Sequence, residues 1–97
     1  MSVSEASKKV DGGKFVKVRV TETEEGVSVE IVGDFFVYPE SGIGTVESQV
    51  ENSISTDDGD GIETRLRRRI DDENIEMVGI TAETVAETAL EAYGGVE

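Results

Sequence analysis

Two short segments with a strict two-residue hydrophobic alternation constrain the fold of this 97-residue chain most strongly. Valine alternates with lysine and arginine in residues 16–20, and valine and isoleucine alternate with serine and glutamate in residues 27–31. Successive side chains of a strand point to opposite faces, so each segment is a strand with one buried and one polar face. The turn at residues 23–26 ends in a glycine, which tolerates positive φ. Together these features predict a β-hairpin.

The segment after the hairpin is continuously apolar over residues 35–38 and ends at Pro39, which cannot donate to a sheet. Gly33 and Asp34 stand between this segment and the second strand. Such a stretch is either covered by protein on both faces or bent by a bulge at the glycine. The sequence leaves these two alternatives open.

Three later segments have the hydrophobic spacing of amphipathic helices. The first spans residues 43–54 and the second spans residues 62–70, with a polar loop at residues 56–61 between them. The third follows Thr81, a residue type that caps helix N-termini, and ends at the glycine pair 94–95. We therefore predict three helices after the hairpin.

The fold class follows from how these elements must pack. Residues 1–13 lack periodicity, so we expect a flexible N-terminal arm followed by a single domain over residues 14–97. Residues 75–79 fit a short strand and an extended connection equally well. A hairpin alone is too small to be stable, so a third strand or a partner must complete it, with the helices on one face. We expect an α+β two-layer sandwich, a small antiparallel sheet packed against about three helices. The predicted core comprises Val16, Val18, Val20, Val29, Ile31, Phe35, Val46, Val50, Ile54, Leu66, Ile70, Val85, Ala89 and Leu90.

The composition excludes several classes of chemistry. The chain has no cysteine and no histidine, which rules out disulfides, thiolate zinc sites and Ser-His-Asp triads. Its net charge of −13 opposes binding to nucleic acid and to anionic membranes. No apolar run approaches the roughly 20 residues of a membrane-spanning helix, so we expect a cytoplasmic protein. Acidity of this degree favours a halophilic source over an acidic binding surface, because molar salt screens the repulsion.

Three features suggest metal, nucleotide or acid–base chemistry, and each has a simpler explanation. The acidic run at residues 57–61 resembles part of a calcium loop, but Arg67 stands where an EF-hand would place its bidentate glutamate. The glycines at residues 42–44 lack the third glycine of a dinucleotide fingerprint. Asp34 fits a backbone acceptor at a bulge better than a catalytic acid. We therefore expect no catalytic residue and no metal site.

A cluster of arginines is the most unusual charged feature of this acidic chain. Arg65, Arg67, Arg68 and Arg69 supply four of its nine cations and lie on the second predicted helix. Arginine forms bidentate contacts with carboxylates and phosphates. The cluster is either a solvated helix face that pairs with the acidic residues 71–73, or a surface that recognises an anion or a partner protein.

Several segments resemble a known family when they are taken together. Gly-Gly-Lys at residues 12–14, the hairpin, the stretch Ile-Val-Gly-Asp-Phe-Phe-Val-Tyr-Pro-Glu at residues 31–40 and the helix after it resemble the accessory domain of lipoate–protein ligases. The similarity covers roughly residues 12–93 and is closest to the version encoded as a separate chain beside the catalytic subunit. The acidity would suit the version from a halophilic archaeon.

The resemblance implies a non-catalytic role in protein lipoylation. In that family the large domain holds the lipoate and ATP pockets, and the small domain is needed to activate free lipoate to lipoyl-AMP. It implies that this chain binds no cofactor alone, and that lipoate and ATP bind at a catalytic ligase subunit. The resemblance carries over as a structural and docking motif to Gly33, Asp34, Phe35 and Phe36. We add Tyr38, because a continuously apolar segment in a small domain leaves exposed hydrophobic surface.

Two other classes of function stay open. A small protein-binding scaffold or adaptor, related to iron–sulfur assembly helpers with a similar two-layer arrangement, would use the same exposed surface without any adenylation. A stand-alone hydrolase acting through paired carboxylates would require one desolvated pair in a cleft. An acyl-carrier role is excluded, because the chain has no Asp-Ser-Leu attachment site at a helix start.

Overall fold

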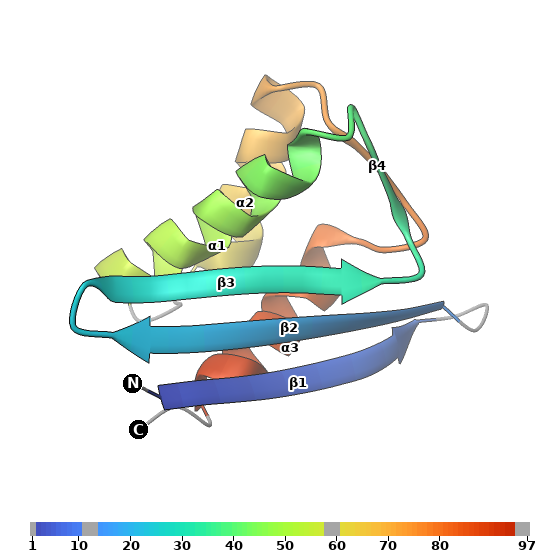
Figure 1. Cartoon of the computed structure of the whole chain (residues 1–97). Coiled ribbons are helices and arrows are strands. Elements are labelled where there is room, and N and C mark those ends of the chain that lie inside the picture. The colour runs from blue at the N-terminus through green and yellow to red at the C-terminus, as the bar shows by residue number, and fades with distance from the viewer. Residues whose placement is uncertain (1, 11–13, 58–60, 95–97) are drawn as a thin grey trace.

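The predicted hairpin is the centre of an α+β fold in a computed structural model of the chain (Figure 1). The structure describes residues 2–10, 14–57 and 61–94. These residues form a three-stranded antiparallel sheet in the order β1-β2-β3, a separate two-stranded ribbon of β4 and β5, and three helices. The elements are β1 (Ser2–Val10), β2 (Lys14–Thr23), β3 (Gly26–Gly33), β4 (Phe36–Tyr38), α1 (Gly42–Asp57), α2 (Ile62–Asp72), β5 (Glu76–Val78) and α3 (Ala82–Gly94).

Strand β1 corrects the prediction of a flexible arm over residues 1–13. Residues 2–10 pair antiparallel with β2 along their whole length and supply the third strand that the hairpin requires. The other residues of the expected arm lie outside the described part of the chain. The alternation is hard to see in the sequence because the side chains on the helix-facing side of β1, Ser4, Ala6 and Lys8, are small or polar.

Helices α1 and α3 cover one face of the sheet, and α2 packs against these two helices. Helix α3 packs behind β1 and β2, and α1 packs along β3 (Figure 1). The other face carries an ion-pair row in which Arg19 Nε lies 2.6 Å from Glu5 Oε2 and Arg19 Nη1 lies 3.4 Å from Glu30 Oε1. These charged side chains are at least partly exposed to water. The alternation that predicts the hairpin therefore separates a buried valine face from a charged outer face.

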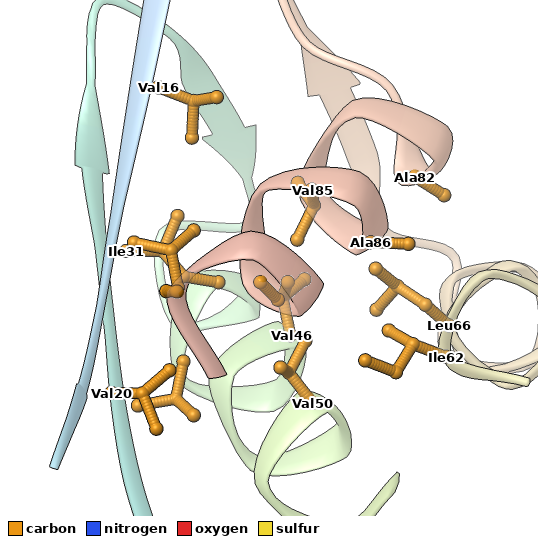
Figure 2. Close-up of a cluster of buried hydrophobic side chains, with 14 of the residues drawn as sticks. Val16, Val20, Ile31, Val46, Val50, Ile62, Leu66, Ala82, Val85 and Ala86 are labelled. Carbon is orange, nitrogen blue, oxygen red and sulfur yellow. The ribbon is translucent and has the colours of Figure 1, made fainter. Parts of the chain in front are cut away.

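The core lies between the sheet and the helices, and most of its predicted members are confirmed. Figure 2 shows Val20 and Ile31 of the sheet on one side of the cluster, Leu66 of α2 on the other, and Val50 and Val85 between them. The confirmed buried members are Val16, Val18, Val20, Val29, Ile31, Val46, Val50, Ile54, Leu66, Val85 and Ala89, while Phe35 and Ile70 are half-buried against them.

The prediction that Leu90 belongs to the core is wrong, because its side chain is 44% exposed. The inward face of α3 is defined by small buried residues, among them Ala86 and Ala89. Each further residue turns about 100° around a helix axis, so the residue after Ala89 leaves that face. The predicted N-cap of this helix is confirmed: the Thr84 N–H donates to Thr81 Oγ1 at 3.2 Å.

The chain bends between β3 and β4, and Gly33 permits the bend. A Cβ at Gly33 would overlap the carbonyl oxygen of Phe15 and crowd the Cα of Val16. The N–H of Asp34 donates to that same carbonyl oxygen at 3.0 Å, and β3 ends at Gly33. Of the two alternatives for this stretch, the structure has the bent one.

The segment at residues 75–79, for which the sequence allows a strand or an extended connection, contains a short strand. Residues Glu76–Val78 form β5 and pair antiparallel with β4. Strand β4 ends at Tyr38, immediately before Pro39, as predicted.

Within the described residues, no helix is both long and apolar enough to cross a membrane.

Candidate functional site

One face of the β4–β5 ribbon presents large apolar side chains to water. Phe36 is 61% exposed, Tyr38 is 52% exposed, and Val78, the cross-strand partner of Phe36, is 45% exposed. The two aromatic rings are stacked, with their centroids 6.5 Å apart and their planes inclined by 20°. We call Phe36, Tyr38 and Val78 the aromatic face. The alternation of a strand places them on one side of the ribbon.

The opposite side of the ribbon is anchored to the start of α1. Val37 and Met77 lie on that side and are half-buried. A Cβ at Gly42 would lie 2.9 Å from Val37 Cγ1 and 3.2 Å from Ile75 Cγ2, so the absence of a side chain lets the helix pack directly on the ribbon. Gly42 therefore has a packing role at the start of α1.

A hollow of about 340 Å³ adjoins the aromatic face. Val32, Phe35 and Ile43 are among the apolar side chains that line it, together with Phe36 and the acidic Glu40. Val32, which is 46% exposed at the end of β3, extends the apolar surface across the bend. The aromatic face therefore lies next to a hollow with apolar lining. Exposed aromatic side chains beside such a hollow are typical of surfaces that bind another protein.

The structure separates the predicted docking residues into three groups. Phe36 and Tyr38 lie on the aromatic face, whereas Phe35 turns inward and packs against the core. Gly33 forms the bend, and Asp34 is exposed with its backbone N–H bonded to the sheet.

Sequence reasoning missed one member of the aromatic face. Val78 comes from a three-residue strand about 40 residues after Phe36 in the sequence, and the pairing of β4 with β5 places it there. No local pattern signals this neighbour, because a strand so short has too few residues to show a period.

The arginine cluster on α2 is partly neutralised by Glu63 of the same helix and by Glu73, which caps its C-terminus. Arg67 Nη2 lies 2.8 Å from Glu63 Oε2, and Arg69 pairs with Glu73, both as neighbours one helical turn apart. Of the acidic residues at 71–73 that were expected to pair with the arginines, the structure shows Glu73 in this role. These contacts favour the interpretation of a solvated helix face.

A second hollow adjoins the arginine cluster. Its volume is about 230 Å³, and Arg65, Arg68 and Arg69 line it with Gln49 of α1 and Asp72. Asp72 adds a carboxylate to the same lining, so the hollow is of mixed charge. The role of the cluster in anion or partner recognition therefore stays a prediction.

The carboxylates of Glu47 and Glu51 are the acidic pair that the structure places against backbone. The N–H groups of Ile31 and Val29 in β3 donate to Glu47 Oε2 at 2.8 Å and to Glu51 Oε2 at 3.1 Å. Burial raises the pKa of Glu47 above its ordinary value; the Ile31 N–H opposes this, while the charges of Glu30 and Glu51 add to it. The two carboxylates accept hydrogen bonds from backbone N–H groups at the edge of β3, which gives them a structural role.

Among the described residues, no group of three acidic side chains is placed to hold a metal ion. Residues 58–60 of the acidic run at 57–61 lie outside the described part of the chain, so the comparison of that run with a calcium loop rests on sequence alone. Comparisons with protein-family models, with curated proteins and with solved structures found no match for this chain. Function is therefore inferred from the residues and the geometry.

Proposed function

We propose that this chain is a non-catalytic accessory subunit of a lipoate–protein ligase. With a separate catalytic subunit, it would take part in the ATP-dependent activation of lipoate to lipoyl-AMP. One observation carries the proposal: Phe36 and Tyr38, in the stretch that resembles the family, are more than half exposed on an anchored ribbon. The proposal assigns the docking of the catalytic subunit to the aromatic face.

The energetics of exposed aromatic rings support a docking role. Large apolar groups that stay in water in the free subunit release free energy when a partner covers them, at about 25 cal/mol per Å². The backbone that carries the rings is held by pairing with β5 and by the packing of the ribbon on α1, so little backbone entropy is lost on association. Aromatic residues are also enriched at the centres of protein interfaces, where they dominate the binding energy.

The charge distribution around the aromatic face supports the same role. Glu76, opposite Tyr38, is the charged residue of that side of the ribbon, and Glu40 lies at the adjoining hollow. An apolar centre with charges at its margin is the usual anatomy of a protein interface. A partner surface with an apolar depression and cations at its margin would be complementary.

The division of labour follows from the side chains that this chain lacks. The chain has no histidine, the most common general base, and no cysteine, a common nucleophile of acyl transfer. The proposal therefore places lipoate and ATP on the catalytic subunit and gives this chain a role in shape and positioning. It also places both chains in the cytoplasm, as expected from the sequence.

The test is to mix the purified chain with the catalytic ligase subunit from the same source, in high potassium, and to measure adenylate formation from lipoate and ATP. The proposal predicts co-elution of the two chains and adenylate formation only when both are present. Absence of both co-elution and stimulation would contradict it. In that case the protein-binding scaffold becomes the better interpretation of the aromatic face.

A further inference from the structure

The two edges of the three-stranded sheet differ in how they are closed. Helix α1 closes the edge at β3, where Glu47 and Glu51 accept the N–H groups of Ile31 and Val29. Strand β1 forms the other edge, and β2 is its neighbouring strand. Figure 1 shows α1 alongside β3, whereas α3 lies behind the sheet at β1. Among the described residues, no second strand pairs with the outward edge of β1. An uncovered edge strand is a template for another strand.

The register shows which backbone groups of β1 face outward. Successive residues of a strand direct their N–H and C=O groups to opposite edges. The backbone N–H groups of Val29 and Ile31 point away from β2, so the backbone groups of Glu30, between them, point toward β2. Arg19 is the partner of Glu30, and its backbone groups therefore point toward β3. Glu5, the partner of Arg19 in β1, therefore directs its backbone groups outward. The same holds for every second residue of the strand, which adds Val3, Ser7 and Lys9.

We propose that a second copy of this chain pairs with this edge antiparallel, joining two three-stranded sheets into one of six strands. The side chains of β1 favour a two-fold axis at Ser7. This axis places Glu5 of each copy directly opposite Lys9 of the other, so two ion pairs form on the open face of the sheet. Self-complementarity of this kind is what an isologous interface requires.

The charge of β1 suits an approach by a second copy. Each copy carries a net charge of −13, so most surfaces of two copies repel each other. The outer face of β1 carries Lys9 and Glu5, one charge of each sign, while the inward Lys8 is offset by Glu87 and Glu91 of α3. This edge therefore meets less repulsion than the rest of the molecule.

The inward lysine of β1 leaves the edge accessible. An inward-pointing charge on an edge strand can prevent pairing, because the approaching strand would bury it. Lys8 Nζ lies 2.8 Å from Glu91 Oε1 and 3.7 Å from Glu87 Oε2, both on α3 beneath the sheet. The charge is thus compensated within its own chain, away from the edge. Strand β1 also contains no proline or glycine over its nine residues.

Two substitutions test the pairing by sedimentation analysis of the full chain in high potassium. Ser7→Pro removes one outward N–H, a position that tolerates proline because it makes no bond to β2. Lys9→Glu places like charges opposite each other at both pairs and should weaken dimerisation about ten-fold. Arg68→Glu is the control, because it makes the same charge change on α2, away from β1.

The proposal predicts a dimer for the wild type and for Arg68→Glu, and a shift to monomer for Ser7→Pro and Lys9→Glu with unchanged circular dichroism. If Ser7→Pro does not fold, Lys9→Glu decides the question. A wild type that stays monomeric at about 100 μM overturns the proposal. Dimers that persist in the folded β1 variants overturn it as well. A monomer whose binding to the catalytic subunit is lost in Ser7→Pro would assign the edge to that subunit. The aromatic face lies on β4 and β5, so the monomer–dimer state of the free chain can be measured independently of the proposed function.

Discussion

Glu47 on α1 accepts a hydrogen bond of 2.8 Å from the backbone N–H of Ile31, and so ties the helix to the outer edge of the sheet. Glu51, one helical turn later, does the same for Val29, two residues earlier in the strand. Four helical residues rise about 6 Å and two strand residues span about 6.7 Å, so the two spacings match. The helix and the strand run in opposite directions along this contact, and the edge is closed to further strands.

Replacing Glu47 by alanine should lower the free energy of unfolding by about 1–2 kcal/mol, because the Ile31 N–H loses its acceptor in a partly buried position. Urea denaturation measures this loss. Glu47→Gln is the matched control, since the amide oxygen still accepts the bond and the loss should be smaller. Equal stability of the alanine and glutamine variants would show that the hydrogen bond contributes nothing.

The pH dependence of stability should have opposite signs at Glu47 and Glu5. Burial raises the pKa of Glu47, so the folded chain keeps its proton at pH values where the unfolded chain, near 4.5, has released it. The contribution of Glu47 to stability therefore falls as pH rises through its raised pKa. The hydrogen bond from Arg19 lowers the pKa of Glu5, so the contribution of Glu5 is present above 4.5 and is lost as pH falls.

Unfolding measured from below pH 4.5 to neutral pH separates these two effects. Relative to Glu47→Gln, the wild type should lose stability as pH rises, and relative to Glu5→Gln it should lose stability as pH falls. Parallel pH profiles for the wild type and both variants would contradict the assignment.

Two glycines should respond to alanine in opposite directions. Gly33→Ala should destabilise the fold by about 1–3 kcal/mol, because its Cβ would overlap the Phe15 carbonyl at the bend. Gly44 lies within α1 with open space around it, so Gly44→Ala should stabilise the fold by about 0.5–1 kcal/mol. Thermal unfolding of the two variants checks this, and a neutral Gly33→Ala would show that the bend does not depend on glycine.

Exposure of the aromatic face predicts that truncation there spares the fold. Phe36→Ala and Tyr38→Ala should each lower the free energy of unfolding by less than about 1 kcal/mol, since surface substitutions have small effects. Ile54→Ala, in the core, is the comparison and should cost about 2–5 kcal/mol. A loss of several kcal/mol at Phe36 would make it a core residue and remove the basis for docking.

Salt should stabilise this chain. Its net charge of −13 produces self-repulsion, which salt screens as the Debye length falls from about 10 Å at 0.1 M to about 3 Å at 1 M. The unfolding midpoint should therefore rise with KCl across this range. A flat profile would argue against a halophilic origin for the acidity.

The parts of the fold that could be predicted are those whose apolar residues repeat at the spacing of a strand or a helix. Val16, Val18 and Val20 alternate strictly and are fully buried, because each faces the helices from the central strand. Strand β1 was not predictable from its own residues, since Ala6 and Lys8 on its inner side lack the apolar alternation. Its strand conformation comes from pairing with β2.

The sequence predicts part of the candidate site, namely the residues that a local pattern makes recognisable. Phe36 and Tyr38 belong to a run of four apolar residues before a proline, so their exposure could be anticipated. The inward turn of Phe35 depends on the bend at Gly33, and the position of Val78 depends on a pairing between segments far apart in the sequence. Tertiary contacts of this kind leave no periodic trace in one sequence.

Adenylate formation from lipoate and ATP tests the docking role of the aromatic face. The catalytic subunit is titrated with the wild-type chain, with a Phe36→Ala/Tyr38→Ala double variant and with Leu90→Ala. Leu90 is also exposed but lies on α3, away from the aromatic face. We expect the double variant to need at least about 30-fold more protein for half-maximal activity, as for an interface hot spot, with Leu90→Ala like the wild type. Equal stimulation by all three proteins, or none by the wild type, would show that the aromatic face does not dock the catalytic subunit.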